Sequence, residues 1–129
     1  MPDTHEAITR LLESKSRIDL AYLFGSLARG SAHSGSDLDL AVLARPSLSV
    51  EERIALIENL AGLLGRPVDL VDLTVCGGPL LGEILRHGIQ VKGSSSDHAE
   101  WVSRHLGMME DFYPYVQRML KERRESWIG

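Results

Sequence analysis

Residues 22–42, YLFGSLARGSAHSGSDLDLAV, contain the features that decide the fold. An apolar segment is followed by Gly25-Ser26, a short basic turn and a polar loop, and then by a second apolar segment that carries Asp37 and Asp39. Both apolar segments are typical of strands. Residues i and i+2 of a strand face the same side, with Cα atoms about 6.6 Å apart at about 3.3 Å per residue. The sequence therefore predicts a half-buried strand that presents two carboxylates side by side.

The two aspartates indicate a site for a divalent cation. Like charges at this spacing disfavour their joint ionisation unless a positive charge lies between them. Mg²⁺ binds carboxylate oxygens and keeps its remaining positions for water and substrate phosphates. An isolated Asp-x-Asp is also compatible with a solvated strand end, so the metal interpretation depends on what accompanies it.

Gly25 and Ser26 accompany it, at the end of the first predicted strand. Glycine lets the backbone approach another group closely or adopt a positive φ. Ser26 supplies a hydroxyl and begins a short predicted helix over 26–29, whose free N–H groups can bind an anion. Arg29 adds a guanidinium near the same place. Together these features predict a phosphate site beside a metal site.

The strings GSLARG and SDLDLAV resemble the signature of the DNA polymerase beta-like nucleotidyltransferase superfamily. The short chain with its Ala-Arg-Gly continuation resembles the minimal nucleotidyltransferases, in particular the MntA-type antitoxins of HEPN/MNT toxin–antitoxin pairs. The specific likeness covers residues 18–73. It implies the nucleotidyltransferase fold, ATP as nucleotide donor, and transfer of AMP to a tyrosine hydroxyl of a HEPN ribonuclease toxin, which is thereby neutralised.

A third acidic position lies in the segment RPVDLVDL, residues 66–73. In a period-two strand Asp69 and Asp72 face opposite sides, so only one of them can share a face with the Asp-x-Asp pair. The resemblance implies a third carboxylate on a neighbouring strand and favours Asp69 for it. Asp72 remains the alternative, although a residue near a strand end is often solvated or caps the next turn.

The resemblance also implies the roles of the site residues. Two Mg²⁺ ions are expected, one gripping the triphosphate and one lowering the pKa of the acceptor hydroxyl. The residues expected to act in catalysis and to bind the metal are Asp37, Asp39 and Asp69. The residues expected to contact the nucleotide are Gly25, Ser26 and Arg29.

Length and composition agree with a small globular protein. The chain has 129 residues, 43% hydrophobic and 25% charged, which suits one domain of ordinary size. A net charge of −4 argues against a basic nucleic-acid-binding surface. Cys76 is the single cysteine, which excludes an internal disulfide and favours a reducing cytoplasm. We expect no signal peptide or membrane span.

Periodicity predicts an α/β (α+β) fold in which helices pack on a small mixed sheet of about four strands. A capping box at Ser49 and Glu52 and a closing Gly65 delimit one helix. Helices are predicted over 4–15, 50–64 and 80–87. Strands are predicted over 18–24, 37–43, 66–73 and 89–92, the last at an edge of the sheet.

The last part of the chain predicts a loop followed by one long helix. Asp97 and Glu100 suggest a capping box, and apolar residues keep helical spacing to about residue 124, with a kink at Pro114. We expect a nucleotidyltransferase core over 1–93 and a helical extension over 94–129. A helix this long either packs on its own sheet or offers a surface to a partner; Trp127 and several methionines favour a partner.

Two further functions stay open. One is a small-molecule nucleotidyltransferase of the aminoglycoside type, which would need an oligomer because the chain has no room for a second substrate-binding domain. The other is a non-catalytic antitoxin that only binds its toxin. A pure binder has no physical need for three clustered carboxylates, so the aspartates argue against it.

Overall fold

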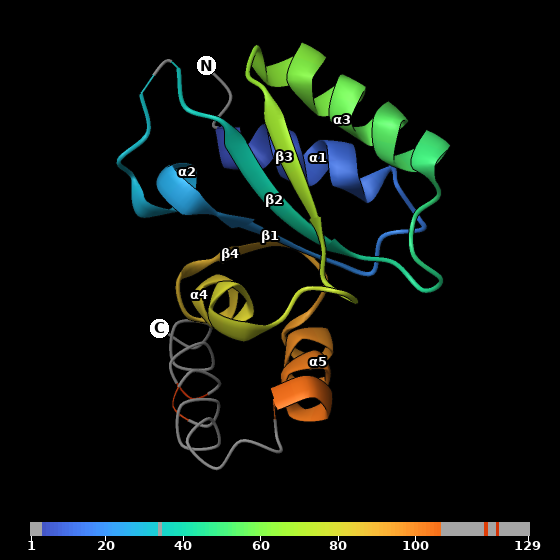
Figure 1. Cartoon of the computed structure of the whole chain (residues 1–129), viewed down its shortest axis with the longest axis vertical. Coiled ribbons are helices and arrows are strands. Elements are labelled where there is room, and N and C mark those ends of the chain that lie inside the picture. The colour runs from blue at the N-terminus through green and yellow to red at the C-terminus, as the bar shows by residue number, and fades with distance from the viewer. Residues whose placement is uncertain (1–3, 34, 107–117, 119–120, 122–129) are drawn as a thin grey trace. The chain divides into compact units, whose positions relative to one another are not determined.

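The computed structural model describes residues 4–33, 35–106, 118 and 121 (Figure 1). The chain divides into two compact units, Met1–Lys92 and Gly93–Gly129. The elements, in chain order, are α1 (Thr4–Glu13), β1 (Leu20–Phe24), α2 (Gly25–Arg29), β2 (Leu38–Leu43), α3 (Val50–Leu64), β3 (Val68–Asp72), α4 (Gly78–His87), β4 (Ile89–Lys92) and α5 (Ser95–Leu106).

The first unit is built on a four-stranded mixed sheet with the strand order β3-β2-β1-β4. The strand β1 is antiparallel to both β2 and β4, whereas β2 and β3 are parallel. The helix α3 supplies the crossover that two parallel neighbours require. The four predicted strands and the edge position of β4 are confirmed.

Helices cover both faces of this sheet, with α1 and α3 on one face and α4 on the other (Figure 1). The core under α1 and α3 consists of buried aliphatic side chains from the helices and the alternating strand positions, which include Ile8, Leu12, Leu23, Leu38, Leu40, Leu56 and Leu60. Each such side chain stabilises the fold by about 1.5–3 kcal/mol. Leu81, Ile84 and Leu85 of α4 are buried at helical spacing.

Local signals fix the ends of α3 as the sequence predicted. The Ser49 hydroxyl accepts a hydrogen bond from the Glu52 N–H at 3.1 Å, and the Glu52 carboxylate accepts one from the Ser49 N–H at 2.9 Å. Gly65 ends the helix with φ 65° and ψ 31°, a left-handed conformation that suits glycine. The reciprocal capping box and the glycine cap are both confirmed.

Several predicted boundaries were wrong. The first helix ends at Glu13 rather than at residue 15, and α4 begins at Gly78 rather than at residue 80. The strands β2 and β3 are shorter than the predicted ranges 37–43 and 66–73. The first strand begins at Leu20 rather than at residue 18, because the N–H of Ile18 donates to the carbonyl of Lys15 and closes a turn. The segment 93–97 was predicted as a loop, but α5 begins at Ser95. The capping box there joins Ser94 and Asp97, whose side chains each accept a backbone hydrogen bond from the other residue.

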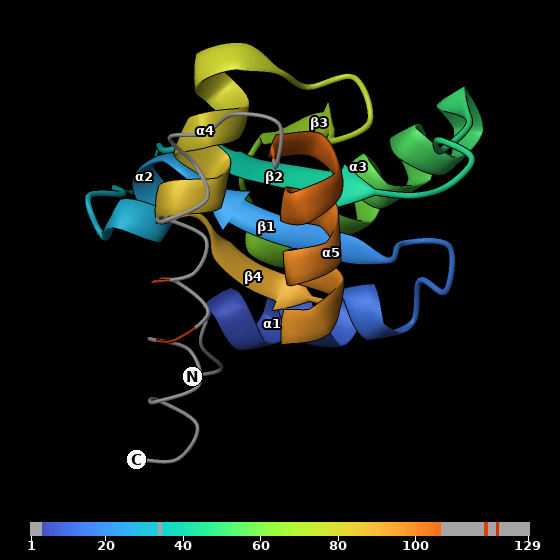
Figure 2. The same cartoon turned by 90° about the horizontal axis from the view of Figure 1, so that it is seen from below.

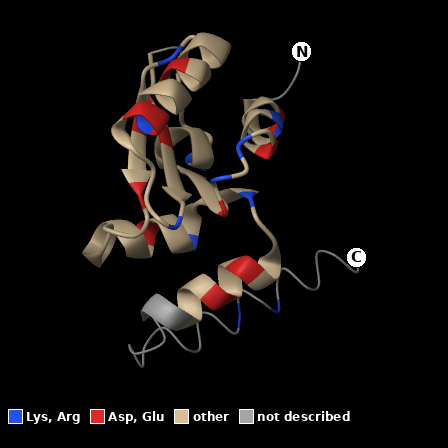
Figure 3. Cartoon of the chain, turned by 90° about the vertical axis from the view of Figure 1, so that its right-hand side faces the viewer, with Lys and Arg blue, Asp and Glu red and all other residues tan. Residues whose placement is uncertain are grey.

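The predicted continuation of the last helix to about residue 124, its kink at Pro114 and the role of Trp127 lie outside the described residues. Within the part of the chain that the structure describes, no helix is both long and apolar enough to span a bilayer. On the side drawn in Figure 3, Lys and Arg residues of the described segments are interspersed with Asp and Glu residues. This distribution differs from the single-sign stripe that is typical of nucleic-acid-binding domains.

Candidate active site

The close approach of Gly25 to Asp39 forms the centre of the candidate site. Gly25 begins α2 directly after β1 and has φ 70°, a conformation that L side chains rarely adopt. A Cβ atom built on Gly25 would collide with Oδ2 of Asp39 and lie 3.0 Å from its Cγ. Position 25 therefore requires glycine for two reasons: the backbone has a positive φ, and the Asp39 carboxylate fills the space that a side chain would need.

The strand register brings two of the predicted aspartates side by side. Asp39 pairs with Phe24 of β1 on one side and with Asp69 of β3 on the other. Residues in direct register on neighbouring strands point to the same face of the sheet. Asp37 lies two residues before Asp39, immediately before β2 begins. Asp37 and Asp69 are exposed and Asp39 is half-buried, so the cluster opens to solvent at one end of the sheet.

Asp72, the alternative third carboxylate, has another role in the structure. It lies three residues after Asp69 on the same strand, and alternation directs it to the other face. Its Oδ1 accepts hydrogen bonds from the N–H of Thr74 at 2.9 Å and from the Thr74 hydroxyl at 2.7 Å. Burial raises the pKa of Asp72, but these hydrogen bonds outweigh it and hold the pKa below its usual value. Asp72 therefore caps the turn after β3.

Burial and the neighbouring charges disfavour the ionised form of Asp39. Burial raises the pKa of its carboxyl above the usual value, and the negative charges of Asp69 and Asp37 raise that pKa further. The positive charge of Arg29 acts in the opposite direction, whereas Glu83 adds another raising contribution. A cation near Asp39 would relieve this repulsion.

Arg29 ends α2 and lies near these carboxylates. Its Nη1 donates to Oε1 of Glu83 in α4 at 3.2 Å. Glu83 was not among the predicted site residues. The two residues are 54 positions apart, so no local pattern in the sequence indicates that they pair. The helix that carries Arg29 begins at Gly25, one residue earlier than predicted.

The loop between the two motifs is held by Arg66. Its Nη1 donates to the carbonyl oxygen of His33 at 2.6 Å and to that of Ser36 at 2.9 Å. The N–H of Leu38 donates to the carbonyl of Pro67 at 2.8 Å, which begins the pairing of β2 with the β3 segment. The chain that leads into the aspartates is thus fixed to the start of β3.

The aspartates fit a hard divalent cation by their chemistry and position. Asp37, Asp39 and Asp69 offer only oxygen donors at one end of the sheet, and the charges of the other two raise the pKa of Asp39. Within the described residues, no three His, Cys, Asp or Glu side chains are gathered closely enough to hold a metal ion. Without a bound cation, the three carboxylates repel one another and have no energetic reason to move closer together. The oxygen donors therefore suit Mg²⁺ in their chemistry and in their position on the sheet, but in this structure the described side chains are not close enough together to hold the ion.

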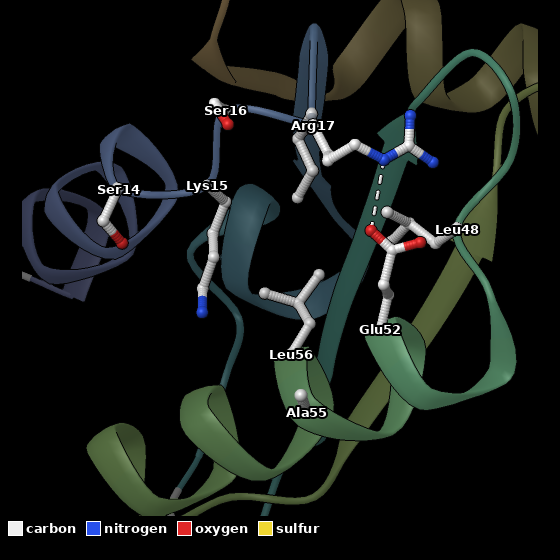
Figure 4. A pocket seen from close by; sticks show the side chains of 9 residues that line it. Ser14, Lys15, Ser16, Arg17, Leu48, Glu52, Ala55 and Leu56 are labelled. Atoms are coloured by element: carbon white, nitrogen blue, oxygen red, sulfur yellow. Dashed lines mark hydrogen bonds and ion pairs between the residues drawn. The ribbon is translucent and has the colours of Figure 1, made fainter.

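A pocket of about 270 Å³ lies elsewhere in the first unit (Figure 4). It borders the turn after α1 and the first turns of α3, and Nε of Arg17 donates to Oε2 of Glu52 across it at 3.1 Å. These segments adjoin Leu20 and Leu43, which pair at the end of β1 and β2 opposite to Asp39. None of the residues predicted for catalysis lines this pocket.

Comparison with known proteins places the chain in a family. The family model described as "Polymerase beta, Nucleotidyltransferase" matches residues 6–97. Protein adenylyltransferase MntA of Shewanella oneidensis is 33% identical over 118 residues, covering 92% of this chain and 85% of that protein.

Solved toxin–antitoxin structures contain chains of the same fold. One, a crystal structure of a toxin–antitoxin with AMP-PNP, matches with a TM-score of 0.72 and 30% identity, covering 93% of this chain and 98% of that chain. Another, tri-AMPylated Shewanella oneidensis HEPN toxin in complex with MNT antitoxin, matches with a TM-score of 0.66 and 28% identity, covering 94% and 96%. The nucleotidyltransferase fold and the resemblance predicted from sequence are confirmed, and the chain belongs to the polymerase beta nucleotidyltransferase family.

Proposed function

We propose that this protein transfers AMP from ATP to a tyrosine hydroxyl of a partner HEPN ribonuclease toxin and thereby acts as its antitoxin. The observation that carries the proposal is the pairing of Asp39 with Asp69 in register, beside a glycine that leaves room for the Asp39 carboxylate. The relative at 33% identity bears the name protein adenylyltransferase. The matched complex with an AMPylated HEPN toxin supports the same acceptor class.

The proposed roles follow from position. Ser26, in the first turn of α2, would donate its hydroxyl to a phosphate oxygen, and the Arg29 guanidinium would pair with the same triphosphate. Gly25 keeps the backbone close to Asp39. Asp37, Asp39 and Asp69 would hold two Mg²⁺ ions, which when bound neutralise the phosphate charge and lower the pKa of the acceptor hydroxyl.

In the transfer step, the tyrosine oxygen attacks the α-phosphorus of ATP in line with the bond to the β-phosphate oxygen. That bond breaks and pyrophosphate leaves, while the hydroxyl proton passes to the carboxylate of Asp69. Asp69 is the exposed member of the Asp39–Asp69 pair, so it faces an incoming acceptor. The protein contributes placement and charge compensation and forms no covalent bond with the substrate.

The open position of the cluster supports a macromolecular acceptor. Asp37 and Asp69 are exposed, so the first unit alone leaves them in water. A docked protein surface would exclude that water and strengthen the electrostatic interactions at the site. We also propose that residues 1–93 form the catalytic core, that residues 94–129 form a helical extension, and that the protein works in the cytoplasm.

The test is transfer of label from α-labelled ATP. The wild-type chain is incubated with Mg²⁺ and a candidate HEPN partner protein, and the Asp39→Asn variant serves as the inactive control. Label on the HEPN protein, mapped to tyrosine, supports the proposal. Label on an aminoglycoside and none on the HEPN protein would instead establish the small-molecule alternative. Inhibition of the toxin that needs no ATP would support a purely binding antitoxin.

A further inference from the structure

An ion pair joins the end of α2 to α4 next to the carboxylate cluster. Nη1 of Arg29 lies 3.2 Å from Oε1 of Glu83. Both helices belong to the first unit; they overlap in the view of Figure 2 and stand apart in that of Figure 1, so the two long side chains bridge the space between them. The pair therefore occupies the rim of the proposed nucleotide site, where Arg29 is expected to meet phosphate.

We propose that Glu83 is a competing anion that occupies the Arg29 guanidinium until a nucleotide phosphate displaces it. The inference rests on the proposed function, because it assigns Arg29 to the triphosphate. In this scheme the Glu83 carboxylate is a stand-in anion. It competes with the nucleotide for the same guanidinium.

The exposure of the pair makes the exchange favourable. The Arg29 side chain is 54% exposed and that of Glu83 is 46% exposed. Ion pairs this open to solvent stabilise a fold only weakly, so breaking this one costs little. A phosphate offers the guanidinium a more highly charged partner and two parallel hydrogen bonds, which a single contact to Glu83 does not provide. We therefore expect that replacing Glu83 by a triphosphate at the Arg29 guanidinium lowers the free energy.

Glu83 also contributes directly to the electrostatics of the cluster. Arg29 lowers the pKa of Asp39, whereas Glu83 raises it, so both charges are felt at the central carboxylate. A negative charge at residue 83 opposes an incoming triphosphate as well as holding its arginine. Neutralising Glu83 should strengthen nucleotide binding in two ways: it removes a charge that repels the triphosphate, and it releases the Arg29 guanidinium. Removing Arg29 eliminates the second effect and leaves the first.

The experiment is a double-mutant cycle on binding of AMP-PNP with Mg²⁺, measured by calorimetry on the full chain. Glu83→Gln keeps the side-chain size and is expected to tighten binding about two- to fivefold. In an Arg29→Gln background most of that gain should vanish, because no guanidinium remains to be released. Glu58→Gln is the matched control, since it removes one negative charge from an exposed position of α3 and should leave the affinity unchanged.

The outcomes are distinct. If Glu83→Gln tightens binding equally with and without Arg29, Glu83 acts only through its charge, and the proposed competition for Arg29 is wrong. Unchanged or weaker binding in Glu83→Gln, in a variant whose unfolding midpoint matches that of the wild type, also overturns it. If the folded wild-type protein binds no AMP-PNP at all, the proposed function fails first, whatever Glu83 does.

Discussion

Replacing Gly25 by alanine tests the geometry on which the candidate site depends. The substitution adds a Cβ atom where φ is 70° and where the carboxylate of Asp39 already fills the space. A left-handed backbone costs a non-glycine residue about 1–2 kcal/mol. The carboxylate must also move away, and a displacement of about 1 Å at a reacting centre costs on the order of 100-fold in rate.

Gly78 supplies a matched control for backbone strain. It also begins a helix, has φ 61°, and has no neighbouring atom within 4 Å of an added Cβ. Gly78→Ala should therefore lose about 1–2 kcal/mol in urea unfolding, and Gly25→Ala should lose at least as much, because its Cβ also displaces the Asp39 carboxylate. Only Gly25→Ala should lose about 100-fold in single-turnover transfer of AMP to the HEPN protein. If Gly25→Ala keeps transfer within about threefold of Gly78→Ala, the close approach to Asp39 has no catalytic importance.

Three other substitutions extend the test. Asp39→Asn should abolish transfer yet be at least as stable as the wild type near neutral pH in chelator, because the raised pKa of Asp39 means that its ionisation destabilises the folded state. Urea unfolding should show that this advantage shrinks on acidification and vanishes well below pH 3.8, where the carboxyl is protonated in both states. Lower stability of Asp39→Asn at neutral pH would contradict this. Ser26→Ala should weaken AMP-PNP binding by about 1–3 kcal/mol in calorimetry, and unchanged affinity would argue against the phosphate contact. Arg66→Ala removes the hydrogen bonds to the carbonyls of His33 and Ser36 and should cost about 1–2 kcal/mol in urea unfolding, with a smaller loss for Arg66→Lys.

Features with short sequence separation were predicted well from the sequence. The alternation around Asp39 predicts a strand, which is confirmed from Leu38 onward, because a period of two depends only on neighbouring residues. The capping box at Ser49 and Glu52 is equally local and is confirmed. At the start of α5 local signals competed: several serines and two acidic residues could cap, and Ser94 with Asp97 proved to be the pair.

Features with long sequence separation could not be predicted in this way. Periodicity separated Asp69 from Asp72, but only the parallel register of β2 and β3 places Asp69 beside Asp39. Without the family resemblance the choice would have stayed open. Glu83 lay beyond sequence reasoning altogether, because its partner Arg29 is on another helix and nothing in the sequence near either residue indicates the pairing.

From the charges around Asp39 we expect nucleotide binding to depend on divalent cations such as Mg²⁺. The charged groups that act on Asp39 are the carboxylates of Asp69, Asp37 and Glu83 and the guanidinium of Arg29. Together with Asp39 itself, these are four carboxylates and one guanidinium among the described residues, so negative charge predominates around Asp39. An anionic triphosphate is repelled by such a cluster until divalent cations reverse its sign. AMP-PNP affinity should therefore fall steeply when Mg²⁺ is removed, whereas Asp39→Asn, which lowers the repulsion, should show a weaker dependence on Mg²⁺.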